Sequence, residues 1–171
     1  MRALGQRTIV GAQAVVVDGR GRVLLQLRPW PVGWEPPGGH VGPGEEPSAT
    51  VVRETREETG LEIEVERIIG YYRFTGIRHD TDVVFRARVV GGQLQRSREA
   101  WRLGWVEPER MPRSLFPWYR QRIADALVPS ASAPEERVQP VGVGSVLSHG
   151  FALIGDSVGT LLPTRSGSAP R

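Results

Sequence analysis

The chain has 171 residues, which is enough for one domain with a hydrophobic core and too few for two full domains. Hydrophobic residues make up 39% and charged residues 24% of the sequence, a balance that excludes a wholly disordered or fibrous chain. There is no cysteine, and all 22 basic residues are arginine. Thiolate nucleophiles, cysteine-ligated zinc, Schiff-base lysines and the P-loop lysine are therefore excluded.

The formal net charge of +3 is spread along the sequence and does not favour a nucleic-acid-binding protein. The sequence contains no run of 18 apolar residues, which would predict a membrane span. Its first residues lack the long apolar segment of a secretory signal. We therefore expect a cytoplasmic protein without a membrane partner.

The first part of the sequence predicts strands. Residues 8–17 and 22–28 are apolar or β-branched runs, and Asp-Gly-Arg-Gly between them is a turn signal, so we expect the two runs to pair as a hairpin. Residues 29–39 contain four prolines and three glycines, and they predict a loop without regular structure.

A helix of about 13 residues is predicted over residues 47–59. Pro47 suits the first helical turn, and Gly60 follows where a left-handed cap is expected. The residues at helical spacing that should face a sheet are Ala49, Val52, Thr55 and Thr59.

Alternating apolar and polar residues predict one strand or two over residues 61–74, and further strands over 81–90 and 101–106. A second helix is predicted over 118–127, directly after Pro117. This order of elements predicts an α/β (α+β) protein in which helices pack on a mixed sheet.

From residue 128 onward the composition shifts toward serine, proline, glycine and alanine. We therefore predict a single domain over residues 1–127. Residues 128–171 are expected to form a flexible or loosely packed C-terminal extension, to which no function is assigned.

Three glutamates, Glu54, Glu57 and Glu58, share one face of the first predicted helix, because spacings of three and four return to the same side. Like charges at these spacings destabilise a helix by about 0.2–0.5 kcal/mol per pair, so the cluster needs water or a cation to offset the repulsion. Glutamates in this pattern alone are more typical of a solvated face than of a metal site. The flanking residues must decide between the two.

Five residues separate Gly39 from Glu45, and seven separate Glu45 from Arg53. Arg53 begins the run Arg-Glu-Thr-Arg-Glu-Glu-Thr-Gly-Leu. This pattern resembles the Nudix box, G-x5-E-x7-R-E-U-x-E-E-x-G-U, in which U is an aliphatic residue. Every fixed polar and glycine position is met. The departure is Thr55 at the first U position, where a methyl group can still turn inward. The resemblance is specific over residues 38–61 and extends as a fold over roughly residues 7–127.

The resemblance implies an α/β/α sandwich around a mixed sheet, with the box forming a loop, a helix and a loop. It also implies an Mg²⁺-dependent hydrolase, with Mn²⁺ as the other candidate ion, that cleaves a diphosphate bond in a nucleoside diphosphate linked to a group X. A metal-activated water attacks phosphorus in this reaction. The implied substrate is a small nucleotide-type diphosphate, and the protein is expected to be a monomer or a homodimer.

Carried over by position, the metal ligands are the carboxylates of Glu54, Glu57 and Glu58 and the backbone carbonyl of Gly38. Oxygen ligands of this kind suit a hard cation. The residues expected to support the box are Gly39, Glu45, Arg53 and Gly60. Arg53 is expected to pair with either Glu45 or Glu57.

The predicted catalytic residues are Glu57, Glu58 and Glu99. A carboxylate must take the proton of the attacking water, and the two candidates for this base are Glu58 and Glu99. Glu99 is equally consistent with an additional metal ligand or with an ordinary loop carboxylate.

Residues outside the box are candidates for substrate binding, since aromatic rings stack on bases and arginines bind phosphates. These candidates are Arg28, Trp34, Arg73 and His79. Aromatic residues in a small domain are, however, more often part of the core. No subfamily signature downstream of the box is matched, so the group X is not identified.

The alternative to an enzyme is a Nudix-like module that binds a nucleotide or metabolite without hydrolysing it. Such modules often lose glutamates of the box. All of them are present in this chain, which favours the enzyme.

Overall fold

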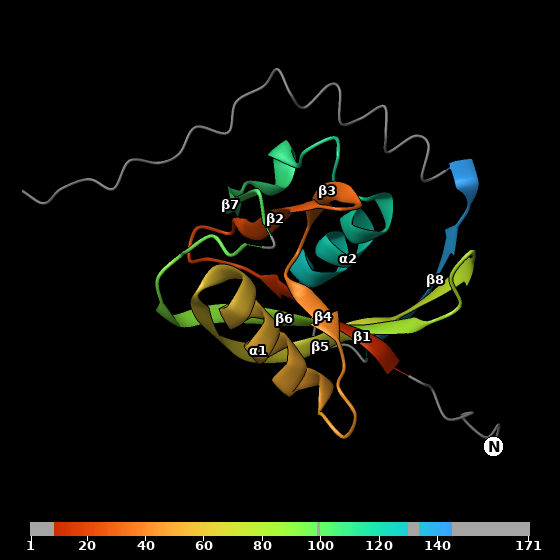
Figure 1. Ribbon diagram of the computed structural model, residues 1–171, viewed down its shortest axis with the longest axis horizontal. Coiled ribbons are helices and arrows are strands. Elements are labelled where there is room, and N and C mark those ends of the chain that lie inside the picture. The colour runs from red at the N-terminus through yellow and green to blue at the C-terminus, as the bar shows by residue number, and fades with distance from the viewer. Residues whose placement is uncertain (1–8, 99, 130–133, 145–171) are drawn as a thin grey trace, which may run out of the picture.

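The computed structural model describes residues 9–98, 100–129 and 134–144. In chain order its elements are β1 (Ile9–Val16), β2 (Val23–Pro29), β3 (Val32–Glu35), β4 (Gly38–His40), α1 (Pro47–Thr59), β5 (Leu61–Gly76), β6 (Thr81–Gly92), β7 (Arg102–Val106), a short 3₁₀ helix (Pro108–Arg110), α2 (Pro117–Leu127) and β8 (Glu135–Val141) (Figure 1). This combination confirms the predicted fold class. Neither described α-helix has the length and apolar character needed to span a membrane.

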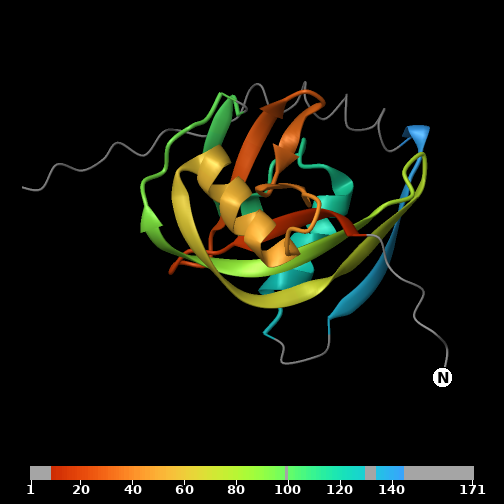
Figure 2. The ribbon, with the colours of Figure 1, turned by 60° about the horizontal axis from the view of Figure 1, so that its bottom comes forward.

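The strands form two sheets. The larger sheet has the order β4-β1-β6-β5-β8, and it is mixed because β1 pairs with β6 and β5 with β8 in parallel, while the other pairs are antiparallel. The smaller sheet is antiparallel, with the order β3-β2-β7. Figure 2 shows β5 and β6 as long curved strands that lie side by side across the molecule.

The larger sheet is covered on both faces, as in the predicted sandwich. Along β1, Val15 packs in one core cluster with Tyr119 and Ile123 of α2. Its neighbour Val16 packs in a second cluster with Val51 of α1. Because successive side chains of a strand point to opposite faces, α1 and α2 lie on opposite sides of β1.

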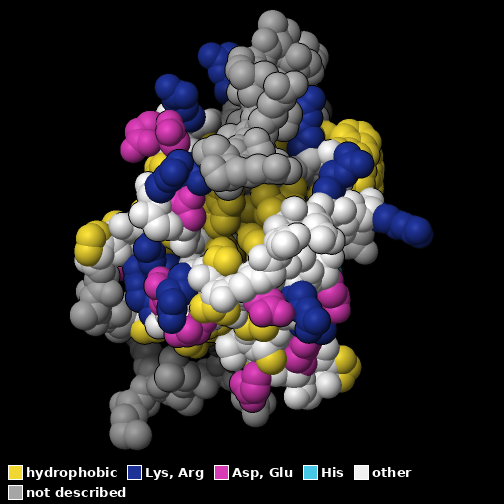
Figure 3. All heavy atoms as spheres, turned by 90° about the vertical axis from the view of Figure 1, so that its left-hand side faces the viewer, with side chains coloured by type: hydrophobic (Ala, Val, Ile, Leu, Met, Phe, Trp, Pro, Cys, Tyr) yellow, Lys and Arg dark blue, Asp and Glu magenta, His cyan; other side chains and the backbone are white. Residues whose placement is uncertain are grey.

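Charged side chains on this fold are interspersed. Across β5 and β6, Arg86 pairs with Glu66 at 2.9 Å and Arg88 pairs with Glu64 at 2.7 Å. On the face seen in Figure 3, arginine and acidic side chains lie next to one another around an apolar area. The arginines on that face are therefore not gathered into a basic patch.

The predicted hairpin of residues 8–17 and 22–28 is wrong. β1 lies in the larger sheet and β2 in the smaller one, and a single bridge between Val17 and Val23 joins their ends. The predicted turn is present, since Asp18 accepts hydrogen bonds from the N–H groups of Arg20 and Arg22, both at 2.9 Å. The local pattern of neither run revealed that each pairs with a distant strand.

The predicted loop over residues 29–39 is also wrong, because β3 and β4 lie within it. Its prolines end β2 and separate β3 from β4, and they leave residues 32–35 free to pair with β2. β3 lies at the edge of its sheet, where neighbouring prolines cost no ladder hydrogen bonds.

Helix α1 has the predicted bounds, and Gly60 caps it in the left-handed conformation, with φ of 73°. Its buried face differs from the prediction. Thr55 and Thr59 are buried as expected, whereas Ala49 and Val52 are exposed. The inner face instead carries Val51 and Glu58, so the helix buries a carboxylate against the sheet side of the molecule.

The strands predicted around residues 61–74, 81–90 and 101–106 are confirmed, the first as one strand, and the second helix begins one residue earlier than predicted. The tail contains an element that its composition did not predict. Residues 135–141 form β8, which pairs along β5 and buries Gln139 and Val141. A flexible or loosely packed extension is therefore the wrong description of residues 135–141, and the prediction for residues 130–133 and 145–171 lies outside the described residues.

Gln139 fixes β8 to the rest of the fold. Its side-chain oxygen accepts from Arg122 at 3.0 and 3.2 Å, and its amide donates to the Trp118 carbonyl at 2.9 Å. Gln139→Leu leaves these buried groups without partners and should lower the free energy of unfolding by about 1–3 kcal/mol, as measured by urea denaturation. The matched control is Val138→Ala on the same strand, an exposed position whose change should stay within about 0.5 kcal/mol. Equal losses in the two variants would contradict this role for Gln139.

Candidate active site

A cavity of about 360 Å³ lies where β1, β4 and the inner face of α1 meet. Its walls carry polar side chains from the box, from the smaller sheet and from the start of β6. The residues that line it include Gly11, Gln13, Arg28, Glu35, Gly38, Gly39, Glu54, Glu58, Arg78, Asp82 and Tyr119.

The two glycines that begin the box bring the backbone of β4 close to its neighbours. A Cβ atom at Gly39 would lie 2.4 Å from the carboxyl carbon of Glu54. At Gly38 a Cβ atom would lie 2.4 Å from the carbonyl oxygen of Ala12 in β1. A side chain at Gly38 would meet the backbone of β1, so glycine is required there, and a side chain at Gly39 would displace the Glu54 carboxylate.

Glu58 is the most deeply placed acidic group of the box, with 8% of the residue exposed. Its Oε2 accepts a hydrogen bond from the Gly38 N–H at 3.0 Å. Burial raises the pKa of Glu58 to about 8, against the lowering effect of hydrogen bonds from Gln26 and Gly38, and the nearby Glu35 and Glu54 raise it further. A cation in this cavity would relieve the repulsion.

Arg53 holds the other carboxylates of the box. It binds both oxygens of Glu45, at 2.9 and 3.0 Å, and it donates to Glu54 at 2.8 Å and to Glu57 at 3.3 Å. The hydrogen bonds from Arg53 lower the pKa of Glu45 to about 2. Both partners proposed for Arg53 from the sequence are therefore present, and Glu45 is the one bound through two bonds.

The three predicted acidic ligands do not lie equally close to the cavity. Glu54 and Glu58 line it, while Glu57 lies outside it with 60% of its side chain exposed. Within the described part of the chain, no three acidic or histidine side chains are placed to hold a metal ion together. Mg²⁺, however, is commonly bound by one or two carboxylates together with substrate phosphates and water, so the donors in this cavity fit such an ion.

The other predicted residues are divided among several places. Arg28 lines the cavity and donates to Glu35 at 3.2 Å. Trp34 is buried in the core, Arg73 lines a separate hollow between β5 and β8, and His79 is exposed between β5 and β6. The structure does not bring these three residues to the cavity, and Glu99 lies outside the described residues.

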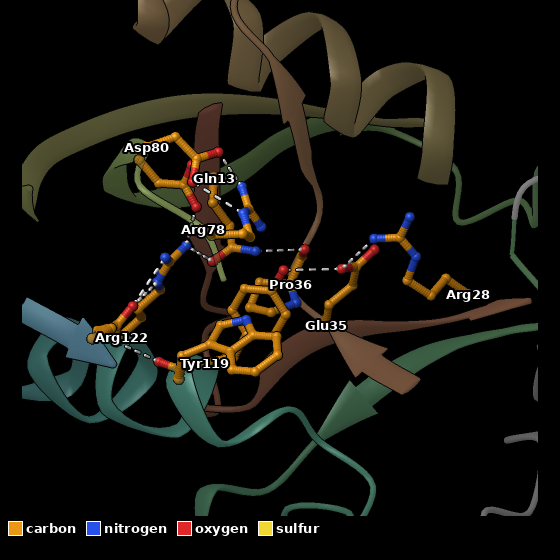
Figure 4. Close-up of polar contacts among 11 residues, drawn as sticks. Gln13, Arg28, Glu35, Pro36, Arg78, Asp80, Tyr119 and Arg122 are labelled. Carbon is orange, nitrogen blue, oxygen red and sulfur yellow. Dashed lines mark hydrogen bonds and ion pairs between the residues drawn. The ribbon is translucent and has the colours of Figure 1, made fainter. Parts of the chain in front are cut away.

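The sequence pattern did not identify Glu35 and Tyr119, which form part of the cavity wall. Tyr119 of α2 donates its hydroxyl to Glu35 at 3.1 Å, to the same oxygen that Arg28 binds. Burial raises the pKa of Glu35, and the positive charge of Arg28 opposes this rise. Figure 4 shows Arg28, Glu35 and Tyr119 in one chain of polar contacts.

A polar residue inside an apolar run was the signal that could have identified more of this wall. Gln13 stands in the middle of β1, and Asp82 stands at the start of β6 before three apolar residues. Both are buried and both line the cavity. Since a buried polar group must find a partner, such positions predict a network.

Comparison with known proteins supports the family indicated by the box. The family model described as NUDIX domain matches residues 7–126. A MutT-like protein of Streptomyces ambofaciens is 36% identical over 118 residues, which cover 69% of this chain and 76% of that protein. A putative 8-oxo-dGTP diphosphatase of Bacillus subtilis is 34% identical over 116 residues, which cover 67% of this chain and 77% of that protein.

Among solved structures, an ADP-ribose pyrophosphatase of Streptococcus suis superposes with a TM-score of 0.61 at 24% identity, over 75% of this chain and 97% of that one. This likeness concerns the fold. Together, the complete box, the sandwich around it and the match of the family model over residues 7–126 show that the chain belongs to the Nudix hydrolase family.

Proposed function

We propose that this Nudix hydrolase uses Mg²⁺ to cleave a diphosphate bond in a nucleoside diphosphate linked to a group X. The observation that carries the proposal is the meeting of Glu54, Glu58 and the glycines of β4 in one cavity, with Arg28 and Arg78 on its walls. Carboxylates suit a hard cation and arginines suit phosphate, so the cavity offers partners for both.

Glu54 and Glu58 are the residues that would hold the ion in the cavity. Bound Mg²⁺ neutralises phosphate charge and lowers the pKa of a coordinated water. Glu57 and the Gly38 carbonyl remain predicted ligands. The Glu57 carboxylate lies outside the cavity, where Arg53 binds it. Arg53 keeps Glu54 in position through its bond at 2.8 Å.

For the proton of the attacking water, the described cavity offers Glu58. Its Oε2 accepts a hydrogen bond from the Gly38 N–H, which fixes the orientation of the carboxylate. Arg28 would orient the phosphates through its N–H groups. Glu99 stays the second predicted base.

The group X is left open by the relatives. One is named for 8-oxo-dGTP, and another, 33% identical over 113 residues, is an ADP-ribose pyrophosphatase of Methanocaldococcus jannaschii. Both names describe cleavage at phosphate, on different nucleotides. We therefore expect the walls beyond the box to choose the substrate.

Turnover of nucleoside triphosphates, ADP-ribose, nucleotide sugars and dinucleoside polyphosphates should require a divalent ion, and chelator should abolish it. Glu54→Gln and Glu58→Gln should each lower kcat/KM by more than about 100-fold, because each removes a charged oxygen from the cavity. Phosphate release is the measurement. The control is Glu64→Gln, an exposed carboxylate paired with Arg88, which should keep full activity. Unchanged turnover in both cavity variants would contradict the proposed metal site.

Proton and cation should compete for Glu58, with a measurable effect on stability. In chelator, unfolded Glu58 ionises near its ordinary pKa of 4.5, while the folded protein retains the proton up to about pH 8. The folded state then binds more protons between these values, so its stability should fall as pH rises from about 4.5 to about 8 and level off above this range. Melting temperatures across this range measure the effect. Glu58→Gln should lose this component of the decline, and identical slopes in the two proteins would show that Glu58 is not the group responsible.

A further inference from the structure

A buried arginine lies behind the floor of the cavity. Arg122 of α2 has no exposed surface, and its Nη1 donates to Asp82 Oδ2 at 2.9 Å and to Gln13 Oε1 at 3.2 Å. Its remaining bonds go to Gln139 at 3.0 and 3.2 Å. Figure 4 shows Arg122 reaching from α2 toward Gln13. Four elements, β1, β6, α2 and β8, therefore meet at one guanidinium.

The cost of burying this charge makes the arrangement specific. An arginine removed from water needs both an opposite charge and hydrogen-bond acceptors. Asp82 supplies the charge, and the rings of Tyr72, Phe74 and Tyr119 lie 5.0–5.3 Å from the guanidinium carbon. Asp82 is therefore held in a fixed orientation by its partner.

One oxygen of this network is left for a ligand. Gln13 uses both ends of its amide, since its Nε2 donates to the Pro36 carbonyl at 3.2 Å and its oxygen accepts from Arg122. Asp82 uses only Oδ2, and no described residue donates a hydrogen bond to its Oδ1. Oδ1 lies against Gly11, where a Cβ atom would be only 2.3 Å away. Both Gly11 and Asp82 line the cavity.

This acceptor is set apart from the metal-binding side. Gly38, which binds Glu58, lies opposite Gln13, whereas Asp82 lies beside Gly11, two residues or about 7 Å along β1. Near Asp82 the cavity is lined by the guanidinium of Arg78, a flat group suited to a planar ring. A carboxylate oxygen beside this flat group favours a ring that carries N–H donors and repels carbonyl and phosphate oxygens.

We propose that Asp82 determines base preference, with Oδ1 accepting a hydrogen bond from the exocyclic amino group of a nucleobase. Arg122 is then a positioning residue that acts through Asp82. This inference rests on the proposed function insofar as it takes the substrate to be a nucleotide.

The chemistry of Arg122 makes an amide at position 82 informative. Arginine has donors and no acceptor, so the side chain of Asp82→Asn must turn its oxygen toward Arg122. Its NH₂ group is then left facing the cavity. The substitution keeps the shape of the side chain and replaces the acceptor by a donor.

The experiment is calorimetric binding of nucleoside monophosphates to the full chain in chelator. The probes form two pairs that differ by one amino group: GMP with IMP, and AMP with purine riboside monophosphate. In the unmodified protein, the amino-bearing member of at least one pair should bind at least about tenfold more tightly. In Asp82→Asn that ratio should fall to about one or invert.

Asp125→Asn is the matched control. Asp125 also pairs with an arginine, Arg137 at 3.0 Å, and its side chain is 13% exposed compared with 12% for Asp82, but it does not line the cavity. The control should keep the ratio of the unmodified protein. If Asp82→Asn does not fold, the two ratios in the unmodified protein alone decide the question.

Ratios near one for both pairs in the unmodified protein, or a ratio retained in Asp82→Asn, would overturn the proposal. A parallel loss of affinity for 2′-deoxy analogues would then assign Oδ1 to a ribose hydroxyl instead. The expected ratios without turnover of any diphosphate would remove the proposed function and leave this inference standing. Turnover with ratios of one would remove the inference alone.

Discussion

The hydrogen bond from the Gly38 N–H to Glu58, 3.0 Å long, joins β4 to the inner face of α1. It forms only because β4 approaches its neighbours more closely than any side chain would allow. The bond places a carboxylate where water has little access, and burial raises its pKa to about 8. The helix and the glycines thus meet at one buried acidic group in the cavity. That group is most stable when it is protonated or lies beside a cation.

Arg53 and Arg122 solve related problems on the two sides of the cavity. Arg53 is partly exposed and collects Glu45, Glu54 and Glu57, which prevents these like charges from forcing the helix face apart. Arg122 is fully buried and fixes Asp82 and Gln13 from behind. One arginine arranges the acidic groups expected to act on phosphate, and the other arranges the wall expected to meet the base. Because β8 supplies Gln139 to Arg122, the segment after the second helix takes part in this arrangement.

The sequence predicted most about the box and least about what lies around it. Spacing fixed the bounds of α1 and its glycine cap, because both follow from local backbone preferences. The buried face was harder, since it carries three threonines and Glu58 beside Val51, while Ala49 and Val52 are exposed. In this helix the requirement for a carboxylate in the cavity decides which face is buried, and Glu58 lies on the buried face.

The remaining differences arise from pairing between distant segments. β1 is apolar on both faces and takes β6 and β4 as partners, which no local pattern reveals. β8 was hidden by the composition of the tail, and it is held through Gln139, whose partner lies 17 residues away on α2. Asp82 and Arg122 are 40 residues apart, so their pairing became visible only in the fold.

Glu54 and Glu58 together are proposed to hold a divalent ion in the cavity. Anomalous diffraction from crystals soaked with Mn²⁺ and a non-hydrolysable nucleotide tests it most directly. The account predicts one strong Mn²⁺ peak at about 2.0–2.2 Å from oxygens of both carboxylates and next to the nucleotide phosphates. A peak bound elsewhere on the chain, or a phosphate group held by arginines with no ion between it and the two glutamates, would contradict the account.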